Sequence, residues 1–521
     1  MGLRIGVICM MVIVGLVAVV SSNGDPGKEK PVRKYPRFFP GTRWQIAYGS
    51  YDGVNTFAVD ELLRMVQTYF PYVVAVSDVH DVDPKDEEYL ILVGTAHDNH
   101  LIHDLIEKGK LKPPSGPQGY SIACFASPWK DGQRVIAIAG YDAAGVLYGV
   151  EDFNARILGA VPNNAEPAAN QAAFDSVADF AIAETPAIEN RGLWSWGYVI
   201  YDYRRFFDNM ARLKLNTAII WNDSPPLNCR EVIKYAHSRS VKVILGFHWG
   251  WGVDNLDPNS VEQRKQIKAE VVANFRDNYM GLGMDGIYFQ TFTEHTNQLM
   301  GGRSTAALAC EWVNDIASAI YKLDPKIRIE FGLHAMSIRD HYVDLKPLDP
   351  RIVITWEDAG TLPFTYDPVA PQMDTGTSDP YSSFQATVDY AKELATFRSN
   401  REFSMVAKGW IQLPWETSEH HGPYIMGERD PRFIRKRLAD RQPRWDYVNK
   451  LWQENYPLAA RFYRELLACS PKPFSVTALV EDGMFEEAIQ PSVALYAQTL
   501  WDPHRSDKDL LELSASPYYR R

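Results

Sequence analysis

The sequence predicts an α/β protein in which a (β/α)8 TIM barrel follows a small α+β sandwich domain. Strand-like and helix-like segments alternate eight times after residue 186, which is the repeat of that barrel. A stretch rich in Ala, Asn and Pro at 165–186 separates this alternation from the segments before it. Polar and aromatic residues gather where the predicted barrel strands end, and TIM-barrel enzymes place their chemistry at that end.

The N-terminus predicts export. Within residues 1–24, Arg4 precedes an apolar run over 5–20 and then small and polar residues, the pattern of a secretory signal peptide. A retained membrane anchor is the alternative, because the run approaches the length of a membrane span. Residues 25–40 are polar and contain several prolines, so they are expected to be a linker. We therefore expect a secreted or periplasmic protein without membrane contact once the signal is cleaved.

Composition excludes several classes of function. The net charge of -11 argues against nucleic acid as a partner. Neither a phosphate-binding loop nor a Gly-x-Ser-x-Gly elbow occurs. The 5 cysteines are scattered without metal-ligand spacing, and the sequence does not pair them into disulfides. Several histidines follow the predicted strands, but none has the spacing of a helical zinc motif, so neither a metal nor another cofactor is expected. The sequence carries no signal for an oligomeric state.

Residues 41–185 are predicted to form the α+β domain, with its helices on one face of a sheet. Nothing in this part suggests a catalytic constellation. The expected strands are 46–48, 72–77, 89–94, 120–125 and 134–140, and the expected helices are 55–70, 97–108 and 143–158.

Residues 186–521 are predicted to form the barrel and a C-terminal helix. The expected strands are 190–196, 217–221, 241–248, 286–291, 327–333, 352–356, 403–407 and 475–480. A short helix is expected after the fifth strand, and the remaining helices are expected at 203–214, 228–240, 260–279, 305–323, 382–398, 432–460 and 487–500.

The ends of the predicted strands carry side chains that suit a carbohydrate. Aromatic rings offer platforms for the apolar faces of a sugar, and amides, histidines and carboxylates can bind its hydroxyl groups. We expect a carbohydrate substrate. The predicted substrate-binding residues are Trp194, Trp196, Asn222, Asp223, His248, Trp249, His295, His334, Trp356 and Trp410.

Two carboxylates are needed for glycosidic cleavage, one to protonate the leaving oxygen and one to activate water or attack the sugar. Glu294 follows the β-branched and aromatic run of the fourth strand and is the predicted general acid. Glu357 or Asp358, after the sixth strand, is the predicted second carboxylate, and Trp356 beside them is positioned to raise a carboxyl pKa by desolvation. The alternative for one of this pair is a helix cap or an ion-pair residue.

Four short motifs carry a resemblance to known enzymes, namely 139–150, 210–217, 289–294 and 500–503, the last followed by 506–511. With them the chain resembles the group of the α-glucuronidases (glycoside hydrolase family 67) and the β-hexosaminidase-like enzymes. That resemblance implies a small α+β domain before a catalytic barrel, and it implies that Glu294 ends the segment of the general acid. The Asp-Glu pair of the hexosaminidases is not present, because Thr293 precedes Glu294.

These observations predict an exported glycoside hydrolase acting on an oligosaccharide or polysaccharide. One alternative is a barrel that binds carbohydrate without cleaving it, having lost its second carboxylate. Another is a secreted barrel hydrolase of a different class, such as a metal-dependent deacetylase.

Overall fold

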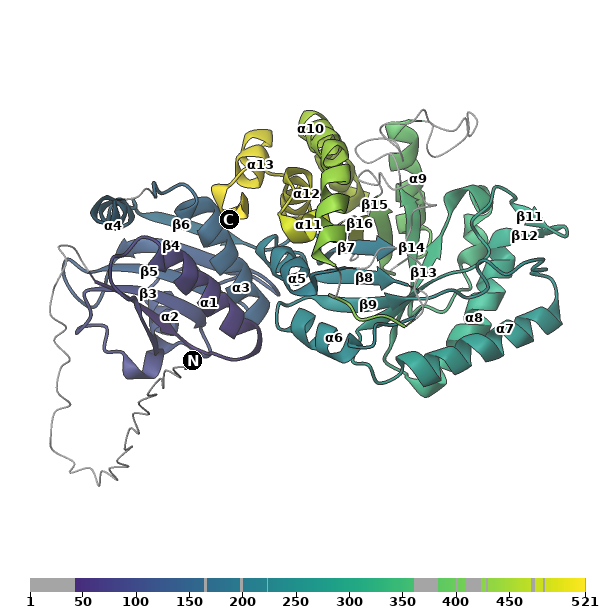
Figure 1. The fold of residues 1–521 in the computed structure, drawn as a ribbon, viewed down its shortest axis with the longest axis horizontal. Coiled ribbons are helices and arrows are strands. Elements are labelled where there is room, and N and C mark those ends of the chain that lie inside the picture. Colours follow the sequence, from purple (N-terminus) through teal and green to yellow (C-terminus); the bar gives the residue numbers. More distant parts are fainter. Residues whose placement is uncertain are drawn as a thin grey trace, which may run out of the picture. The chain divides into compact units, whose positions relative to one another are not determined.

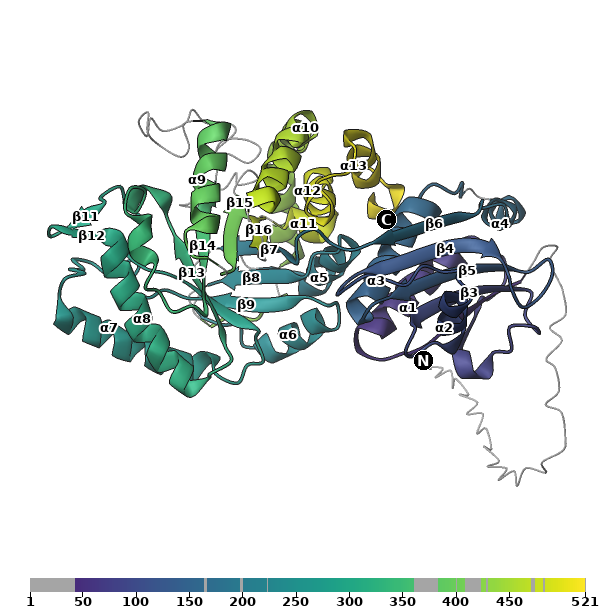
Figure 2. The same cartoon turned by 180° about the vertical axis from the view of Figure 1, so that it is seen from behind.

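A computed structural model describes residues 43–163, 166–196, 200–222, 224–359, 383–399, 401–407, 423–427, 430–469, 474–480 and 483–520. For residues 196, 358, 359 and 407 it describes the backbone only. One compact unit spans Gly41–Arg521, and it contains a six-stranded sheet and a closed eight-stranded barrel (Figures 1 and 2). The predicted fold class is confirmed.

The N-terminal sheet has the strand order β2-β1-β3-β5-β4-β6. Strands β2, β1, β3 and β5 are parallel to one another, whereas β4 is antiparallel to both of its neighbours. The six strands are β1 (Trp44–Tyr48), β2 (Ala75–Asp78), β3 (Tyr89–Thr95), β4 (Tyr120–Ala126), β5 (Arg134–Gly140) and β6 (Phe180–Glu184).

Helices cover both faces of this sheet, so the expectation of helices on one face is wrong. Ile91 and Val93 of β3 face the core shared with α1 (Gly53–Gln67) and α3 (Ala143–Asp152). Leu90 and Leu92 face a second core with α2 (His100–Glu107). Successive side chains of a strand point to opposite faces, so the unbroken apolar run in β3 is typical of a strand buried on both sides.

The stretch at 165–186, expected to be a boundary, contains regular structure. Helix α4 (Pro167–Asp175) is followed by β6, which pairs with β4 and forms an edge of the sheet. In β6 the side chains alternate between half-buried and exposed, as an edge strand requires. Because the stretch is rich in alanine and asparagine, its sequence did not indicate this short strand.

The barrel closes in the order β10-β13-β14-β15-β16-β7-β8-β9, with every pair parallel. Its strands are β7 (Asn190–Trp196), β8 (Thr217–Trp221), β9 (Lys242–Gly246), β10 (Gly286–Gln290), β13 (Arg328–Leu333), β14 (Ile352–Ala359), β15 (Phe403–Ala407) and β16 (Phe474–Leu479). A two-residue hairpin of β11 (Leu299–Met300) and β12 (Arg303–Ser304) follows β10.

Most of the predicted barrel helices are present. After β13, however, the structure has two short 3-10 turns at Ala335–Ser337 and Tyr342–Leu345. The helices are α5 (Tyr203–Arg212), α6 (Cys229–His237), α7 (Val261–Asn274), α8 (Thr305–Leu323), α9 (Phe384–Thr396), α10 (Pro431–Cys469), α11 (Met484–Glu487), α12 (Pro491–Trp501) and α13 (Asp507–Ser514).

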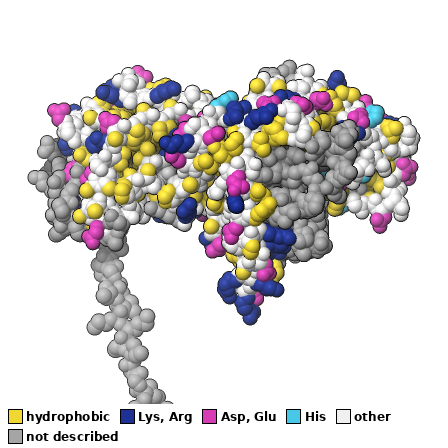
Figure 3. Space-filling view, turned by 90° about the horizontal axis from the view of Figure 1, so that it is seen from above, with side chains coloured by type: hydrophobic (Ala, Val, Ile, Leu, Met, Phe, Trp, Pro, Cys, Tyr) yellow, Lys and Arg dark blue, Asp and Glu magenta, His cyan; other side chains and the backbone are white. Residues whose placement is uncertain are grey.

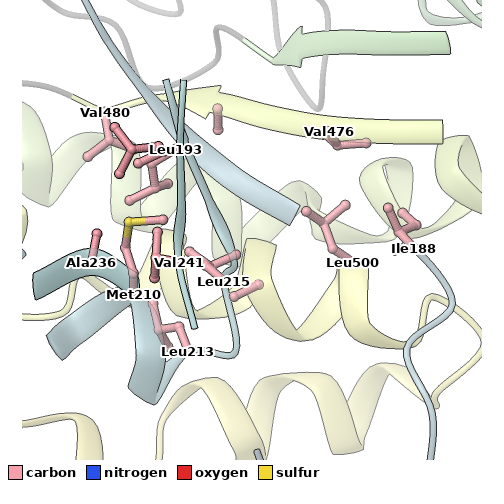
Figure 4. Close-up of a cluster of buried hydrophobic side chains, with 14 of the residues drawn as sticks. Ile188, Leu193, Met210, Leu213, Leu215, Ala236, Val241, Val476, Val480 and Leu500 are labelled. Carbon is pink, nitrogen blue, oxygen red and sulfur yellow. The ribbon is translucent and has the colours of Figure 1, made fainter. Parts of the chain in front are cut away.

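Alternation along the strands separates the barrel interior from the layer beneath the helices. Outward side chains such as Leu193 and Val476 pack with Met210 of α5 and Leu500 of α12 (Figure 4). The interior holds a separate apolar cluster made of Trp194, Ile219, Trp221, Ile244, Tyr288, Val406 and Leu479. The interior is therefore a packed core and not a channel.

A polar network closes the end of the barrel where the strands begin. Arg328 donates to both carboxylate oxygens of Glu402 at 2.7 Å and to Glu330 at 2.7 Å. Asn190 donates to Ser475 at 3.1 Å and accepts from Lys242 at 3.0 Å. The network thus joins strands that are far apart in sequence, at the face opposite to the strand ends where chemistry is expected.

Buried charges also join the N-terminal sheet to the barrel. Lys214, after α5, contacts Asp152 of α3 at 2.9 Å, and both side chains are almost completely buried. Nearby, Glu61 binds Arg64 and Arg212, and the Tyr518 hydroxyl lies within hydrogen-bond distance of both Glu61 (2.9 Å) and Glu151.

The two glutamates of this contact differ in protonation. Burial and the neighbouring charge of Glu61 raise the pKa of Glu151 to about 8. Burial acts in the same direction on Glu61, but hydrogen bonds from Arg64 and Arg212 outweigh it and lower the pKa of Glu61 to about 2. The single hydroxyl proton of Tyr518 can serve only one acceptor, so a protonated Glu151 that donates to Tyr518 leaves that proton for Glu61.

We expect Glu151 to make stability depend on pH. An unfolded glutamate releases its proton near pH 4.3, whereas folded Glu151 keeps it until about pH 8, so this contribution to stability falls as the pH rises between those values. Chemical unfolding of wild type and Glu151→Gln from pH 5 to 8.5 checks this. The wild type should lose up to about 1.4 kcal/mol per pH unit relative to the variant, and a constant difference across the range would contradict the assignment.

Candidate active site

The candidate site lies at the mouth of the barrel, where β9, β10, β13 and β14 end. All barrel strands are parallel, so their C-terminal ends share one face. The structure places two of the predicted acids there, Glu294 after β10 and Glu357 near the end of β14.

Glu357 is held from both sides inside the barrel. Its side chain is 1% exposed. The Tyr288 hydroxyl donates to Oε2 at 2.9 Å, and the Gln290 amide donates to Oε1. Tyr288 and Gln290 are two residues apart on β10 and therefore face the same side of that strand. Neutral donors on both oxygens suit an ionised carboxylate and fix its orientation.

Glu294 has a more open setting. It lies in the turn after β10, and its side chain is 52% exposed. The indole Nε1 of Trp251, which follows β9, donates to Glu294 Oε2 at 2.5 Å. His334, at the end of β13, places Nε2 3.8 Å from Glu294 Oε1. Glu294 is therefore oriented by two neighbouring loops and is accessible to a bound molecule.

The strand order sets the relation between these acids. Strand β13 lies between β10 and β14, so the two acids come from strands about 10 Å apart, twice the usual strand spacing. Gln290 crosses that interval from β10 to reach Glu357. Glu294, His334 and Glu357 therefore come from three consecutive strands of the closed barrel.

Several buried polar atoms at this mouth have no hydrogen-bond partner in the described part of the chain. They belong to β10, β13 and the turns that follow, and they are Gln290 Oε1, Thr291 Oγ1, Thr293 Oγ1, His295 Nε2 and His334 Nδ1. Burial without a partner is costly, so such atoms are expected where a ligand or water completes the hydrogen bonding. Burial, with a smaller effect of His334, lowers the pKa of His295, which favours the neutral imidazole.

The other predicted binding residues are spread between the mouth and the core. Asn222 is buried at the end of β8, His248 is exposed after β9, and Trp194 is buried in the barrel interior, 5.6 Å from the Tyr288 ring. Trp249 stacks on Phe289 with ring centroids 3.6 Å apart. Asp223 and Trp410, and the side chains of Trp196 and Asp358, lie outside the described residues.

The structure does not bring Trp249 and Trp356 to the mouth. Trp249 packs with outward-facing Phe289, and Trp356 packs against Tyr390 of α9 with ring centroids 5.4 Å apart. Neighbouring residues of a strand point to opposite faces, so Trp356 cannot face inward together with Glu357. Trp356 therefore does not supply the desolvation expected for Glu357 from its place in the sequence.

Three residues of the site were not predicted, namely Tyr288, Gln290 and Trp251. The first two carry a signal that could have found them, since they are polar residues at alternate positions of an otherwise apolar strand. Trp251 lies in a turn beyond the end of β9, where the sequence has no periodic pattern from which its contact with Glu294 could be predicted.

Among the described residues, no group of three or more His, Cys, Asp or Glu is arranged to hold a metal ion. No helix in these ranges combines the length and apolar character of a membrane span. None of Cys124, Cys229, Cys310 and Cys469 forms a disulfide.

Comparison with known proteins finds similarity in structure alone. No family model and no curated protein matches the sequence. A GH138 enzyme targeting pectin rhamnogalacturonan II matches with a TM-score of 0.51 and 11% identity, over 90% of this chain and 65% of that one. The structure of CpGH84B matches with a TM-score of 0.50 and 11% identity, over 90% and 69%. A β-N-acetylhexosaminidase from Bacteroides fragilis NCTC 9343 has a TM-score of 0.46 and 11% identity, over 90% and 88%.

These similarities concern the fold. The chain spans about two thirds of the length of the first two proteins, and the identity is low throughout. The named neighbours are glycoside hydrolases, and the narrower resemblance to family 67 stays a prediction.

Gly332 of β13 makes room for the contacts of Glu357. A Cβ at this position would lie 2.8 Å from Glu357 Oε2 and closer still to the Tyr288 hydroxyl. We expect Gly332→Ala to push these side chains apart and to lower the free energy of unfolding by about 1–3 kcal/mol, the usual effect of overpacking. Urea unfolding measures this, and a change below about 0.5 kcal/mol would show that the site accommodates the methyl group.

Proposed function

We propose that this protein is a glycoside hydrolase that cleaves O-glycosidic bonds in an oligosaccharide or polysaccharide. The proposal rests above all on one observation, the pair of carboxylates Glu294 and Glu357 at the mouth of one barrel. A pair of carboxylates flanking the bond is what most glycosidases use. The fold supports the proposal, because similar structures include glycoside hydrolases.

The different settings of the two acids suggest their roles. Glu294 is the accessible one and serves as the general acid. Its Oε2 accepts from Trp251, so the transferable proton belongs on Oε1. Glu357 receives hydrogen bonds on both oxygens and serves as the ionised partner that activates water or attacks the sugar.

The unpartnered polar atoms offer a complement to sugar hydroxyl groups. Gln290 Oε1 can accept a hydrogen bond. His295 Nδ1 accepts from Asn297 N, so a neutral His295 donates at Nε2, whereas a neutral His334 can donate or accept at Nδ1. A hydroxyl-rich ring that fills the mouth would satisfy atoms that are otherwise buried without partners.

Residues 1–24 fit export of this enzyme. The N-terminal sequence of protein recovered from a secreting host tests this part of the proposal, since cleavage near residue 24 is expected. Recovery of the intact N-terminus in the membrane fraction would favour the anchor instead.

Removal of either acid should abolish turnover. We expect Glu294→Gln and Glu357→Gln to lower kcat/KM by about 10² or more on whichever substrate of an aryl-glycoside and polysaccharide panel the wild type cleaves. Glu262→Gln is a matched control, because Glu262 is an 87% exposed glutamate of α7. Full activity of Glu294→Gln would remove it from the acid role. Sugar binding by the wild type without turnover on any substrate would favour the carbohydrate-binding barrel.

The different depths of the two acids favour inversion of the anomeric centre. Retaining enzymes hold their carboxyl groups about 5 Å apart and inverting enzymes about 6.5–9.5 Å apart. Glu357 is buried inside the barrel under Tyr288 and Gln290, whereas Glu294 is half-exposed in the turn beyond β10, and this difference in depth suits the longer distance. Proton NMR of the sugar first released should show the anomer opposite to that of the substrate, and the same anomer would require Glu357 to be a nucleophile.

A further inference from the structure

The first part of α10, residues 431–444, has a charge opposite to that of the whole protein. It contains six Lys and Arg residues and one acid, Asp440, in a chain of net charge -11. The cations are Arg432, Arg435, Lys436, Arg437, Arg441 and Arg444. We call residues 431–444 the basic arm.

The arm extends beyond the part of α10 that packs into the core. The helix has 39 residues, and its buried side chains begin at Trp445. Before that position the apolar Ile434 and Leu438 are half-buried and packed toward the core, whereas the cations are mostly exposed. In Figure 3 dark blue Lys and Arg side chains gather on a projecting part of the surface.

Helix stability does not account for these charges. The N-terminal end of a helix carries partial positive charge, so cations there are unfavourable, and the first turn of α10 has no acidic residue. Arg432 and Lys436 are spaced four residues apart, as are Arg437 and Arg441, and like charges at that spacing destabilise a helix.

Neutralisation by the protein does not account for at least three of these charges. Arg435, Lys436 and Arg444 form no ion pair with the described part of the chain, and all three are exposed. Arg432 contacts Asp430 at 3.2 Å, but its side chain is 84% exposed, so the pair is screened by solvent.

The arm starts on the face of the barrel that carries the candidate site. Residues 423–427, shortly before α10, lie at that face, where Gly427 N donates to Ile200 O at 3.0 Å and Met426 N to Asn228 Oδ1 at 2.9 Å. Ile200 and Asn228 follow the C-terminal ends of β7 and β8. A polymer that runs along the arm can therefore continue to the mouth.

We propose that the basic arm binds an anionic polysaccharide, one with carboxylate or sulfate groups, and holds it beside the barrel mouth. Multiple exposed cations attract a polyanion and raise its local concentration. A lipid surface fits less well, because an interfacial helix presents a broad apolar face outward, whereas Ile434 and Leu438 are turned toward the protein and Phe433 alone of the large apolar side chains of the arm is exposed. The identification of the polymer as substrate rests on the proposed glycosidase function.

Binding to polygalacturonate, sulfated dextran and an uncharged glucan tests the proposal. All proteins carry Glu294→Gln, so that turnover does not consume the probe. The arm variant adds Arg435→Glu, Lys436→Glu and Arg444→Glu. The matched control adds Lys110→Glu, Lys112→Glu and Lys234→Glu, three exposed residues elsewhere that change the net charge by the same amount. Circular dichroism confirms that each protein is folded.

The parent protein should bind at least one anionic polymer about tenfold or more tightly than the glucan, and rising salt should weaken that binding. The arm variant should lose most of this preference, and the control should keep it. Which polymer binds distinguishes carboxylate from sulfate groups.

Equal binding by the arm variant and the control would overturn the proposal. So would preference of the parent for anionic vesicles over every polysaccharide, or self-association at low salt that the arm substitutions remove. These outcomes are independent of catalysis. If the Glu294→Gln enzyme is active, the acid assignment is refuted and the binding result stands. If Glu294→Gln is inactive but the arm variant binds as the parent does, the proposal for the basic arm is refuted and the acid assignment stands.

Discussion

The arrangement of the barrel mouth depends on the hydrogen bonds that Tyr288 and Gln290 donate to Glu357. They connect β10 to β14 across the intervening β13, and Gly332 of β13 leaves the space that they need. A side chain on Gly332 would separate the donors from the carboxylate. Because β10 also leads into the turn with Glu294, the same strand fixes one acid by its side chains and places the other by its backbone.

Much of the fold could be predicted from periodicity, because a strand such as β8 is an apolar segment bounded by polar turns. One prediction failed and one strand was not predicted, both for physical reasons. The run in β3 is apolar on both faces, although helices were expected on one face only, and the short β6 has only alternate residues half-buried. Both cases concern which side of a strand is covered, and that information lies in distant segments.

The acids Glu294 and Glu357 could be located from strand ends, but the orientation of their neighbours could not. Glu357 faces inward and Trp356 outward, a distinction that a strict two-residue alternation predicts once the register is known. Trp251 and His334 reach Glu294 from separate loops. Such contacts depend on loop conformation, which carries no periodic signal in the sequence.

The buried pair of Lys214 and Asp152 limits how the protein can be divided. A barrel expressed without the N-terminal sheet would keep a lysine in a site shaped for an absent carboxylate, and it would expose Arg212 and Tyr518 without their partner Glu61. Fusion of this barrel to an unrelated domain would therefore require substitutions at these positions. In modular terms, the sheet and the barrel have to be exchanged together, and recombination between distant homologues is expected to preserve both sides of this contact.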